Sequence, residues 1–264
     1  MVDRNPAPRN GATRRDAAPA AAFAWGPERV LFEDEWLIVV DKPAGLPTQP
    51  TLDARRASVH ATLAGFLHAR DGGTPYLGLQ HRLDRDTSGV LLFTRDARAN
   101  RGVTELFAGK AVRKTYFALA VAGAGTPDAW EVANHLGVVG REGKASRFGA
   151  VRSGGDPART SFRVVERLSG AVLVEASPQT GRTHQIRVHL AGGGHPILGD
   201  PFYGGPTRVP AGRKGGMIGV PRVMLHAAGL EFVHPMTQAA VKITCPWPQD
   251  FETCLRTLRS ASPA

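Results

Sequence analysis

The sequence contains only two cysteines, Cys245 and Cys254, and no long hydrophobic run. Two cysteines in 264 residues do not form the disulfide framework on which small secreted domains depend. No stretch approaches the roughly 20 consecutive apolar residues that a membrane-spanning helix needs. Residues 1–23 also lack the apolar core of a signal peptide. We therefore expect buried thiols and a cytoplasmic protein.

Motifs for metal, nucleotide and serine chemistry are missing as well. His184 and His189 lie five residues apart with no glutamate between them, which is not the spacing of H-E-x-x-H, and neither cysteine lies near a histidine. The segment AGGGHPILGD is rich in glycine but lacks G-x-x-x-x-G-K-[ST]. G-x-S-x-G is absent too. We expect neither a metal nor any other cofactor.

What the chain has in excess is positive charge. Its 33 Lys and Arg against 23 Asp and Glu give a net charge of +10 and a pI near 10.4. A surface of this kind attracts polyanions, of which nucleic acid is the commonest inside a cell. The 42% hydrophobic content suffices for one sizeable core.

The hydrophobic pattern predicts more strands than helices, without the regular helical crossovers of a doubly wound sheet, and therefore an α+β fold. We predict helices over Ser58–His68 and Asp96–Ala108 and another from about Gln249. Strands are predicted in RVLFEDEWLIVVDK, GVLLFTR, VRKTYFALAVAG, TSFRVVERL, AVLVEASP, MLHAAGLEFV and AVKITCPW. GVLLFTR does not alternate, which is typical of a strand buried on both faces.

Four other parts of the chain have weaker patterns. Residues 126–156 are rich in glycine and predict excursions with short strands, and residues 204–220 predict a mobile basic loop. Residues 183–192 alternate like a strand, but Thr183 as a cap and the following glycines favour a short helix. We expect a flexible tail over residues 1–27 and one catalytic domain over residues 28–260.

The stretch LQHRLDRDTSGVLLFTRD, residues 79–96, places one carboxylate among cations. Asp84 stands between Arg82 and Arg85, which would hold it ionised, as a nucleophile or base must be. A proton donor would need apolar surroundings that raise its pKa. A glycosidase would need a second carboxylate across the substrate, and Asp86 has no obvious separate role. The simpler alternative is an aspartate that only forms a turn.

Several segments, in order, resemble the RluA-type RNA pseudouridine synthases. HRLDRDTSG is similar to that family's H-R-L-D-x-x-T-S-G signature and RKTYFALAVAG to its K-x-Y-x-A-x-V strand. SPQTGRTHQIRVHLAGGGHPILGDPFYG resembles its T-G-R-x-H-Q-I-R-x-H-L segment. VVDKPAGLPTQP resembles its first strand and turn, and MLHAAGLEFVHP its closing strand. The resemblance extends from about Glu28 to Phe251.

The resemblance implies the pseudouridine synthase fold, a mixed, mostly antiparallel sheet flanked by helices around a central active-site cleft. It implies isomerisation of uridine in ribosomal or transfer RNA, by a monomer that flips its target base out of the RNA. The implied catalytic residues are Asp84, Tyr116 beside the uracil, and Arg187, which would make a forked contact with Asp84. The implied RNA contacts are Arg82, Arg182, His184 and Gln185.

Many members of that family carry a small S4-type RNA-binding domain before the catalytic one. The residues before the first family strand are too few for such a domain, so we expect the single-domain branch. Two other functions remain possible from the sequence: an RNA-binding module without chemistry, and a hydrolase that releases free uracil. The first would be favoured by loss of Asp84, Tyr116 or Arg187, and all three are present.

Overall fold

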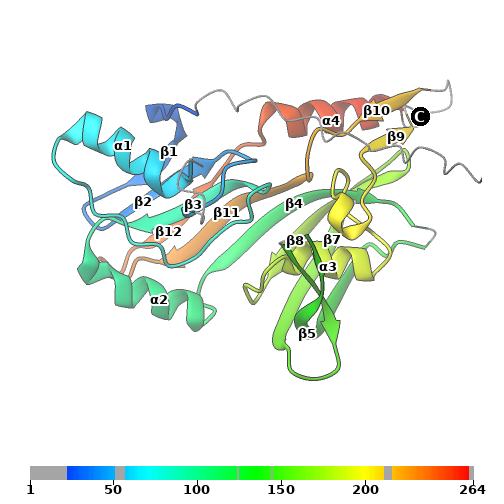
Figure 1. Cartoon of the computed structure of the whole chain (residues 1–264), viewed down its shortest axis with the longest axis horizontal. Helices are drawn as coiled ribbons and strands as arrows, with labels where there is room; N and C mark the ends of the chain where they lie inside the picture. Colours follow the sequence, from blue (N-terminus) through cyan, green and yellow to red (C-terminus); the bar gives the residue numbers. More distant parts are fainter. Residues whose placement is uncertain (1–22, 51–56, 124, 144, 211–215, 262–264) are drawn as a thin grey trace, which may run out of the picture.

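The computed structural model describes residues 23–50, 57–123, 125–143, 145–210 and 216–261 (Figure 1). Its strands are β1 (Val30–Glu33), β2 (Leu37–Lys42), β3 (Ser88–Thr94), β4 (Arg113–Val121), β5 (Ala129–Glu142), β6 (Ala145–Val151), β7 (Asp156–Leu168), β8 (Ala171–Pro178), β9 (Arg208–Pro210), β10 (Met217–Gly219), β11 (Leu225–Val233) and β12 (Ala240–Thr244). Its helices are α1 (Val59–Asp71), α2 (Asn100–Ala108), α3 (Gln185–Gly192) and α4 (Gln249–Ala261), with 3-10 turns at Pro27–Arg29, Ala97–Ala99 and Pro201–Tyr203.

Ten of the strands form one sheet in the order β1-β2-β3-β11-β4-β8-β7-β5-β6, with β12 added beside β11. The pairing of β3 with β11 is parallel, and the other pairs within the described part of the sheet are antiparallel. The α+β fold with a mixed, mostly antiparallel sheet is therefore confirmed. The parallel pair matters most, because it joins the strand that follows Asp84 to the centre of the sheet.

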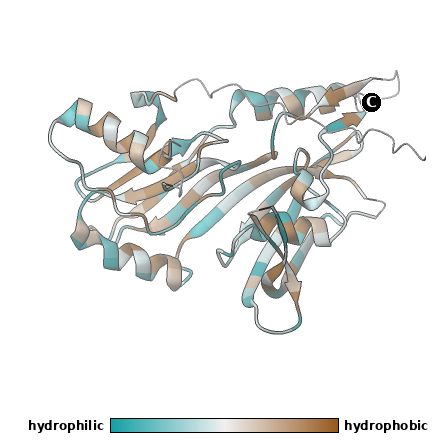
Figure 2. Cartoon of the chain, in the orientation of Figure 1, coloured by the Kyte–Doolittle hydropathy of each residue, from teal (hydrophilic) through white to brown (hydrophobic). Residues whose placement is uncertain are grey.

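The half of the sheet that contains β2 and β3 is covered on both faces. Phe93 packs in one apolar cluster with Leu63 of α1, whereas Leu92 lies in another cluster with Val103 of α2. Successive residues of a strand point to opposite faces, so both sets of side chains must be apolar. This explains why β3 does not alternate and confirms the predicted strand; apolar residues mark β2 and β3 in Figure 2.

The other half of the sheet packs against α3 and α4. Leu119 of β4 lies in one cluster with Leu190 of α3 and with Phe251 and Leu255 of α4. The long β5–β6 hairpin extends beyond this core at the lower right of Figure 1. β4 and β11 run between the two halves, so residues on these strands face elements from both.

Several predicted elements are confirmed. Ser58 caps α1 by accepting a hydrogen bond from the Ala61 N–H at 3.2 Å, and Asp96 accepts one from the Arg98 N–H at 2.7 Å at the start of the 97–108 helical segment. The β7–β8 hairpin and the β11 and β12 strands are also present. These elements could be predicted because their apolar patterns and turn residues lie within the segments themselves.

Three predictions need correction. Residues 129–151 form two long paired strands rather than short excursions, because backbone pairing along β5 compensates for their glycines. In residues 204–220, the described part includes the β9–β10 ribbon, and residues 211–215 lie outside the described ones. α3 is a helix, but His184, not Thr183, is its N-cap residue, and no side chain caps it.

The predicted tail, residues 1–27, lies mostly outside the described residues. The part that is described is packed: the Trp25 indole N–H donates to the Thr62 hydroxyl of α1 at 2.9 Å. Packed structure therefore begins before Glu28. In the described chain, no helix is both long and apolar enough to cross a membrane.

A buried lysine holds the turn that carries Asp84. Lys42, at the end of β2, is fully buried, and its ammonium donates to the carbonyls of Pro43, Arg85 and Thr87 at 2.8, 2.9 and 2.8 Å. Burial lowers its pKa to about 7, against the opposing charges of nearby carboxylates, Asp84 among them. The segment after β2 is thereby tied to the 84–87 turn.

Gly89 fixes where that turn meets the sheet. Its φ of +114° is open to glycine, and a Cβ there would overlap the backbone of Ala227 in β11. Close packing against β11 therefore explains the glycine in the T-S-G part of the signature. Only glycine lets β3 approach β11 closely enough to pair.

We expect Lys42→Met to lower the free energy of unfolding by about 2–4 kcal/mol, since three carbonyls lose their donor in a place closed to water. Lys242→Met is the control, because Lys242 is 71% exposed and pairs only at the surface with Glu231. Its effect should stay within about 0.5 kcal/mol. Urea unfolding of both variants measures the difference. Equal effects would contradict the role given to Lys42.

His81 substitutes for a missing strand partner. β3 pairs with β11 only at its first residues, and further along the Leu92 N–H donates instead to His81 Nε2 at 2.9 Å. The ring stacks on Phe107 at 4.4 Å between centroids. Burial, helped by the charge of Lys114, lowers the pKa of His81 to about 3. The imidazole is thus neutral and acts as an acceptor.

We expect this histidine to make the fold sensitive to acid. The unfolded chain binds a proton at His81 near pH 6.5 and the folded chain only near pH 3, so stability from this group is present above 6.5 and is lost as pH falls toward 3. The slope is at most about 1.4 kcal/mol per pH unit. His81→Gln keeps the acceptor without titrating and should lose less stability over this window. Equal slopes in pH-dependent urea unfolding would refute this.

Candidate active site

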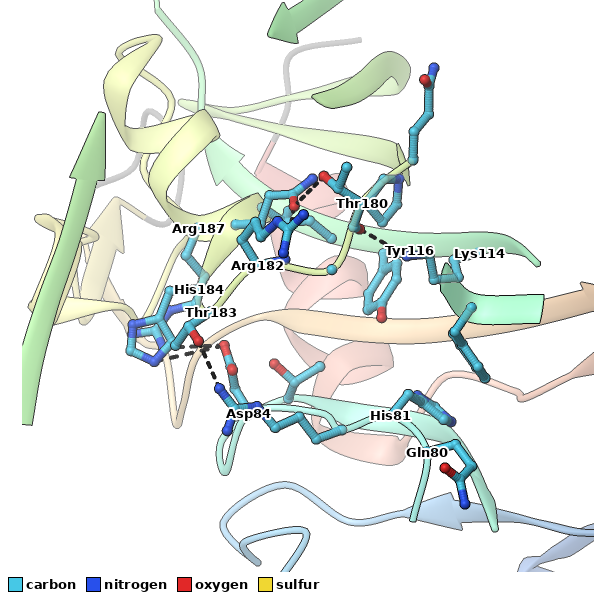
Figure 3. A pocket seen from close by; sticks show the side chains of 18 of the residues that line it. Gln80, His81, Asp84, Lys114, Tyr116, Thr180, Arg182, Thr183, His184 and Arg187 are labelled. Atoms are coloured by element: carbon cyan, nitrogen blue, oxygen red, sulfur yellow. Dashed lines mark hydrogen bonds and ion pairs between the residues drawn. The ribbon is translucent and has the colours of Figure 1, made fainter. Parts of the chain in front are cut away.

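A pocket of about 570 Å³ lies over β4, between the 79–87 segment and the segment that leads into α3 (Figure 3). Among the described residues that line it, Asp84 is the only carboxylate, and the lining also includes five Lys and Arg residues: Arg82, Lys110, Lys114, Arg182 and Arg187. The other predicted site residues, Tyr116, His184 and Gln185, line it too. Segments more than 100 residues apart in sequence therefore converge here.

Asp84 lies at the wall of this pocket, with 24% of its side chain exposed. Its Oδ2 is 3.5 Å from Arg187 Nη1 and 4.0 Å from His184 Nε2. The cations adjacent in sequence, expected to hold it ionised, do not contact it: Arg85 pairs with Asp86 at 2.9 Å, and Arg82 donates to Thr183 at 2.7 Å. The cation beside Asp84 is Arg187, supplied by α3.

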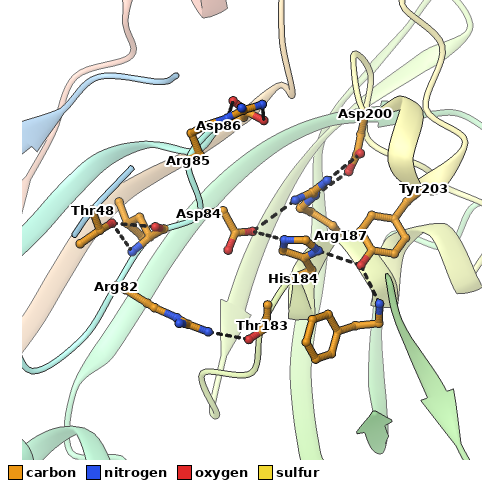
Figure 4. A network of polar contacts seen from close by, with 12 residues as sticks. Thr48, Arg82, Asp84, Arg85, Asp86, Thr183, His184, Arg187, Asp200 and Tyr203 are labelled. Carbon is orange, nitrogen blue, oxygen red and sulfur yellow. Dashed lines mark hydrogen bonds and ion pairs between the residues drawn. The ribbon is translucent and has the colours of Figure 1, made fainter. Parts of the chain in front are cut away.

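Arg187 is buried, and its fork does not go to Asp84. Nε and Nη2 donate to the two carboxylate oxygens of Asp200 at 2.7 and 2.8 Å, which leaves Nη1 for Asp84 (Figure 4). The expected forked contact with Asp84 is therefore wrong. Burial alone would lower the pKa of Arg187, but its bonds to Asp200 and the charges of both carboxylates raise it. The guanidinium is permanently charged.

Tyr203 supports Arg187 and His184 together. Its ring centroid lies 4.9 Å from the Arg187 guanidinium carbon, and its hydroxyl is 2.8 Å from His184 Nδ1. The hydroxyl also accepts the Phe148 N–H at 3.2 Å and still has its own proton to donate to Nδ1. Because the Asp84 carboxylate can only accept, it favours the tautomer of a neutral His184 that carries its proton on Nε2, the nitrogen that faces Asp84.

The backbone of His184 explains its orientation. It adopts a left-handed conformation, φ +56°, which is uncommon for a residue other than glycine and needs support from its surroundings. The hydrogen bond to Tyr203 supplies part of that support. Burial lowers the pKa of His184; the charge of Asp84 opposes the shift and that of Arg187 adds to it. The ring is neutral at pH 7.

Tyr116 extends from β4 into the pocket on the side opposite Asp84 (Figure 3). Burial, with a contribution from the charge of Asp84, raises the pKa of the phenol. Lys114, two residues earlier on the same face of β4, donates to the Thr180 carbonyl at 2.8 Å. Burial lowers its pKa to about 8. β4 thus supplies one wall and anchors the segment before α3.

The polar residues before α3 differ in how accessible they are. Arg182 donates to the Pro157 carbonyl at 3.0 Å and remains at the pocket rim. Gln185 is buried: its amide donates to the Arg159 carbonyl and the Thr160 hydroxyl and accepts from the Arg182 N–H. Its polar atoms are occupied within the protein, so Gln185 shapes this segment instead of facing a ligand.

Sequence reasoning missed Lys42, Asp200 and Tyr203. Asp200 and Tyr203 belong to LGDPFYG, at the end of the segment that resembles the family, where an acidic and an aromatic residue between glycines are typical of a turn. Lys42 precedes a Pro-Ala-Gly break. Neither pattern reveals a partner far away in the chain, so only the fold identifies these contacts. In the described chain, no three His, Cys, Asp or Glu side chains are grouped to hold a metal ion.

The chain is similar to known proteins along most of its length. The RNA pseudouridylate synthase family model matches residues 36–192. The ribosomal large subunit pseudouridine synthase D of Xanthomonas campestris is 36% identical over 89% of this chain and 71% of that protein. The synthase C of Vibrio vulnificus is 36% identical over 88% of this chain and 70% of its own length.

A solved structure agrees with the sequence comparisons. Human RNA pseudouridylate synthase domain containing 4 has a TM-score of 0.68 and 28% identity, covering 88% of this chain and 93% of that one. The family match spans β2 to α3, which includes Asp84, Tyr116 and Arg187. The chain therefore belongs to the RNA pseudouridine synthase family of RluA type and is an isomerase that acts on RNA.

Proposed function

We propose that the protein converts specific uridines of ribosomal RNA to pseudouridine, with Asp84 as the catalytic carboxylate. The observation that carries this proposal is that Asp84 is the single carboxylate among the described residues lining a basic pocket. A glycosidase that uses paired carboxylates would need a second acid at the pocket. Ribosomal RNA is the substrate that the names of the relatives state, and the net charge of +10 suits it.

The reaction breaks the N1–C1′ bond of uridine, rotates the uracil, forms a C5–C1′ bond and moves the C5 proton to a nitrogen of the ring. Asp84 acts either by attack of its carboxylate on C1′ or by removal of a proton from C2′. Both routes need an ionised carboxylate that is free to approach the sugar. A single contact with Arg187 at 3.5 Å is compatible with that freedom, because it leaves the other oxygen unengaged.

Tyr116 forms the wall against which the detached uracil rests. Since the raised pKa of the phenol keeps it protonated at neutral pH, it acts as a hydrogen-bond donor and packing surface. Removal of the C5 proton by Tyr116 would need a phenolate, which the buried setting disfavours. His184 offers a second donor, its Nε2–H, on the side of Asp84 away from Tyr116.

The cations around the pocket bind the RNA backbone. Lys110, Arg182 and Arg82 line its rim and offer phosphate contacts without sequence information. The target base must leave its stack to reach Asp84. Arg82 bridges the mouth by its bond to Thr183, so we propose that it exchanges this partner for the RNA and takes the space that the flipped base vacates.

We expect Asp84→Asn to abolish turnover and to change RNA affinity by less than about tenfold, about 1.4 kcal/mol. Tritium release from ribosomal RNA labelled at uridine C5 measures turnover, and filter binding measures affinity. Asp86→Asn is the control, because Asp86 lies two residues away but pairs with exposed Arg85. It should retain turnover. Activity in Asp84→Asn would overturn the assignment.

We expect Arg187→Lys to lower turnover by about 100-fold or more. A lysine cannot bond to both oxygens of Asp200 and still place a donor beside Asp84, and a displacement of about 1 Å is enough for such a loss. Arg85→Lys, at an exposed ion pair, should remain near wild type. Near-normal tritium release by Arg187→Lys would refute the need for a guanidinium.

A further inference from the structure

We infer that Asp200 and Tyr203, on the turn after α3, are positioning residues for the reaction. They hold Arg187 and His184 so that each presents one N–H to Asp84 while Asp84 itself stays unlocked. This inference rests on the proposed catalytic role of Asp84. Both residues lie beyond the 36–192 span of the family match, and neither is among the described residues that line the pocket.

Asp200 determines which edge of Arg187 faces the pocket. Its side chain is fully buried, and it takes the Nε and Nη2 hydrogens at 2.7 and 2.8 Å. The guanidinium is planar, so engaging that edge directs Nη1 away from Asp200 and toward Asp84 Oδ2, 3.5 Å away. Without Asp200, Arg187 could make a forked, two-bond contact with Asp84, which is stronger than the single contact observed.

That competition has a chemical consequence. A forked bond between Arg187 and Asp84 would occupy both oxygens of Asp84 and would have to break before the carboxylate could reach the sugar. Because Asp200 balances most of the charge of Arg187 inside the protein, Asp84 keeps one weak contact and stays accessible. Asp200 therefore leaves Asp84 with a single weak contact to break when it approaches the sugar.

The turn that carries Asp200 is itself anchored to the sheet. The Leu198 N–H donates to the Leu119 carbonyl of β4 at 2.8 Å, and the Gly205 N–H donates to the Asp200 carbonyl at 2.7 Å. Gly205 admits no side chain, because a Cβ there would overlap the Ile197 carbonyl. These contacts fix the position of Asp200 relative to β4, the strand that also carries Tyr116.

Tyr203 does for His184 what Asp200 does for Arg187. In the tautomer that the Asp84 carboxylate favours, its hydroxyl donates to His184 Nδ1, and the Nε2–H faces Asp84, with Nε2 4.0 Å from Oδ2. Its ring meanwhile packs against the Arg187 guanidinium, 4.9 Å from the carbon. One turn after α3 therefore orients both donors that converge on Asp84 (Figure 4).

The test is the steady-state kinetics of Asp200→Asn with ribosomal RNA, scaled to the folded fraction measured by circular dichroism. We expect kcat to fall by about 100-fold, as for a small displacement of a reacting group, while KM for the RNA stays within about threefold. The matched control is Asp250→Asn, which breaks a similar fork, to Arg222 at 2.6 and 2.9 Å, outside the pocket lining. It should lower stability and leave kcat unchanged.

A second variant keeps the inference testable if Asp200→Asn does not fold. Tyr203→Phe retains the ring under Arg187 and removes only the hydroxyl. We expect kcat to fall by about tenfold, the worth of one hydrogen bond. Nitrogen NMR of the His184 ring should show one tautomer in the wild type and a mixture in Tyr203→Phe.

The outcomes are distinguishable. Wild-type kcat in a folded Asp200→Asn would overturn the role of Asp200, and so would an equal loss in Asp250→Asn, since that would make the effect one of stability alone. An unchanged tautomer and kcat in Tyr203→Phe would overturn the role of Tyr203. If the wild-type protein forms no pseudouridine in ribosomal RNA, the proposed substrate fails instead, while the tautomer measurement still stands.

Discussion

The site depends on one guanidinium shared between two carboxylates. Arg187 gives its fork to buried Asp200 and a single N–H to partly exposed Asp84. A buried charge is costly unless it is paired, so Asp200 is what allows Arg187 to reside inside the protein at all. The pairing adds little net stability by itself, and its value lies in presenting a fixed positive charge to a carboxylate that must remain ionised and mobile.

The sheet brings the members of this arrangement together from distant parts of the chain. Lys42 and Gly89 fix the turn that carries Asp84 against β11, and β4 carries Tyr116 and anchors the turn that carries Asp200. These contacts use residues that other side chains cannot replace. Lys42 donates all three of its hydrogen bonds, Gly89 lies against the backbone of β11, and the side chain of Asp200 is fully buried. Rigid supports of this kind let a small polar cluster act at a defined geometry.

Much of the fold could be predicted from local patterns, because caps and apolar strands are determined by residues close in sequence. The Ser58 cap and the doubly buried β3 are examples. The resemblance indicated the long-range partner Arg187, which lies beside Asp84, but not that its fork goes to Asp200. The residue pattern alone favoured Arg82 and Arg85 as the cations beside Asp84, and the fold turns both away. The motif indicated the pocket residues, and only tertiary structure shows how their hydrogen bonds are divided.

The most direct test of the central claim maps pseudouridines in ribosomal RNA by carbodiimide labelling and reverse transcription. Cells that lack the protein would be compared with cells complemented by the wild type, by Asp84→Asn and by Asp86→Asn. The account predicts that at least one stop vanishes in the deletion and returns with the wild type and Asp86→Asn but not with Asp84→Asn. A stop restored by Asp84→Asn would contradict the claim that this single carboxylate performs the reaction.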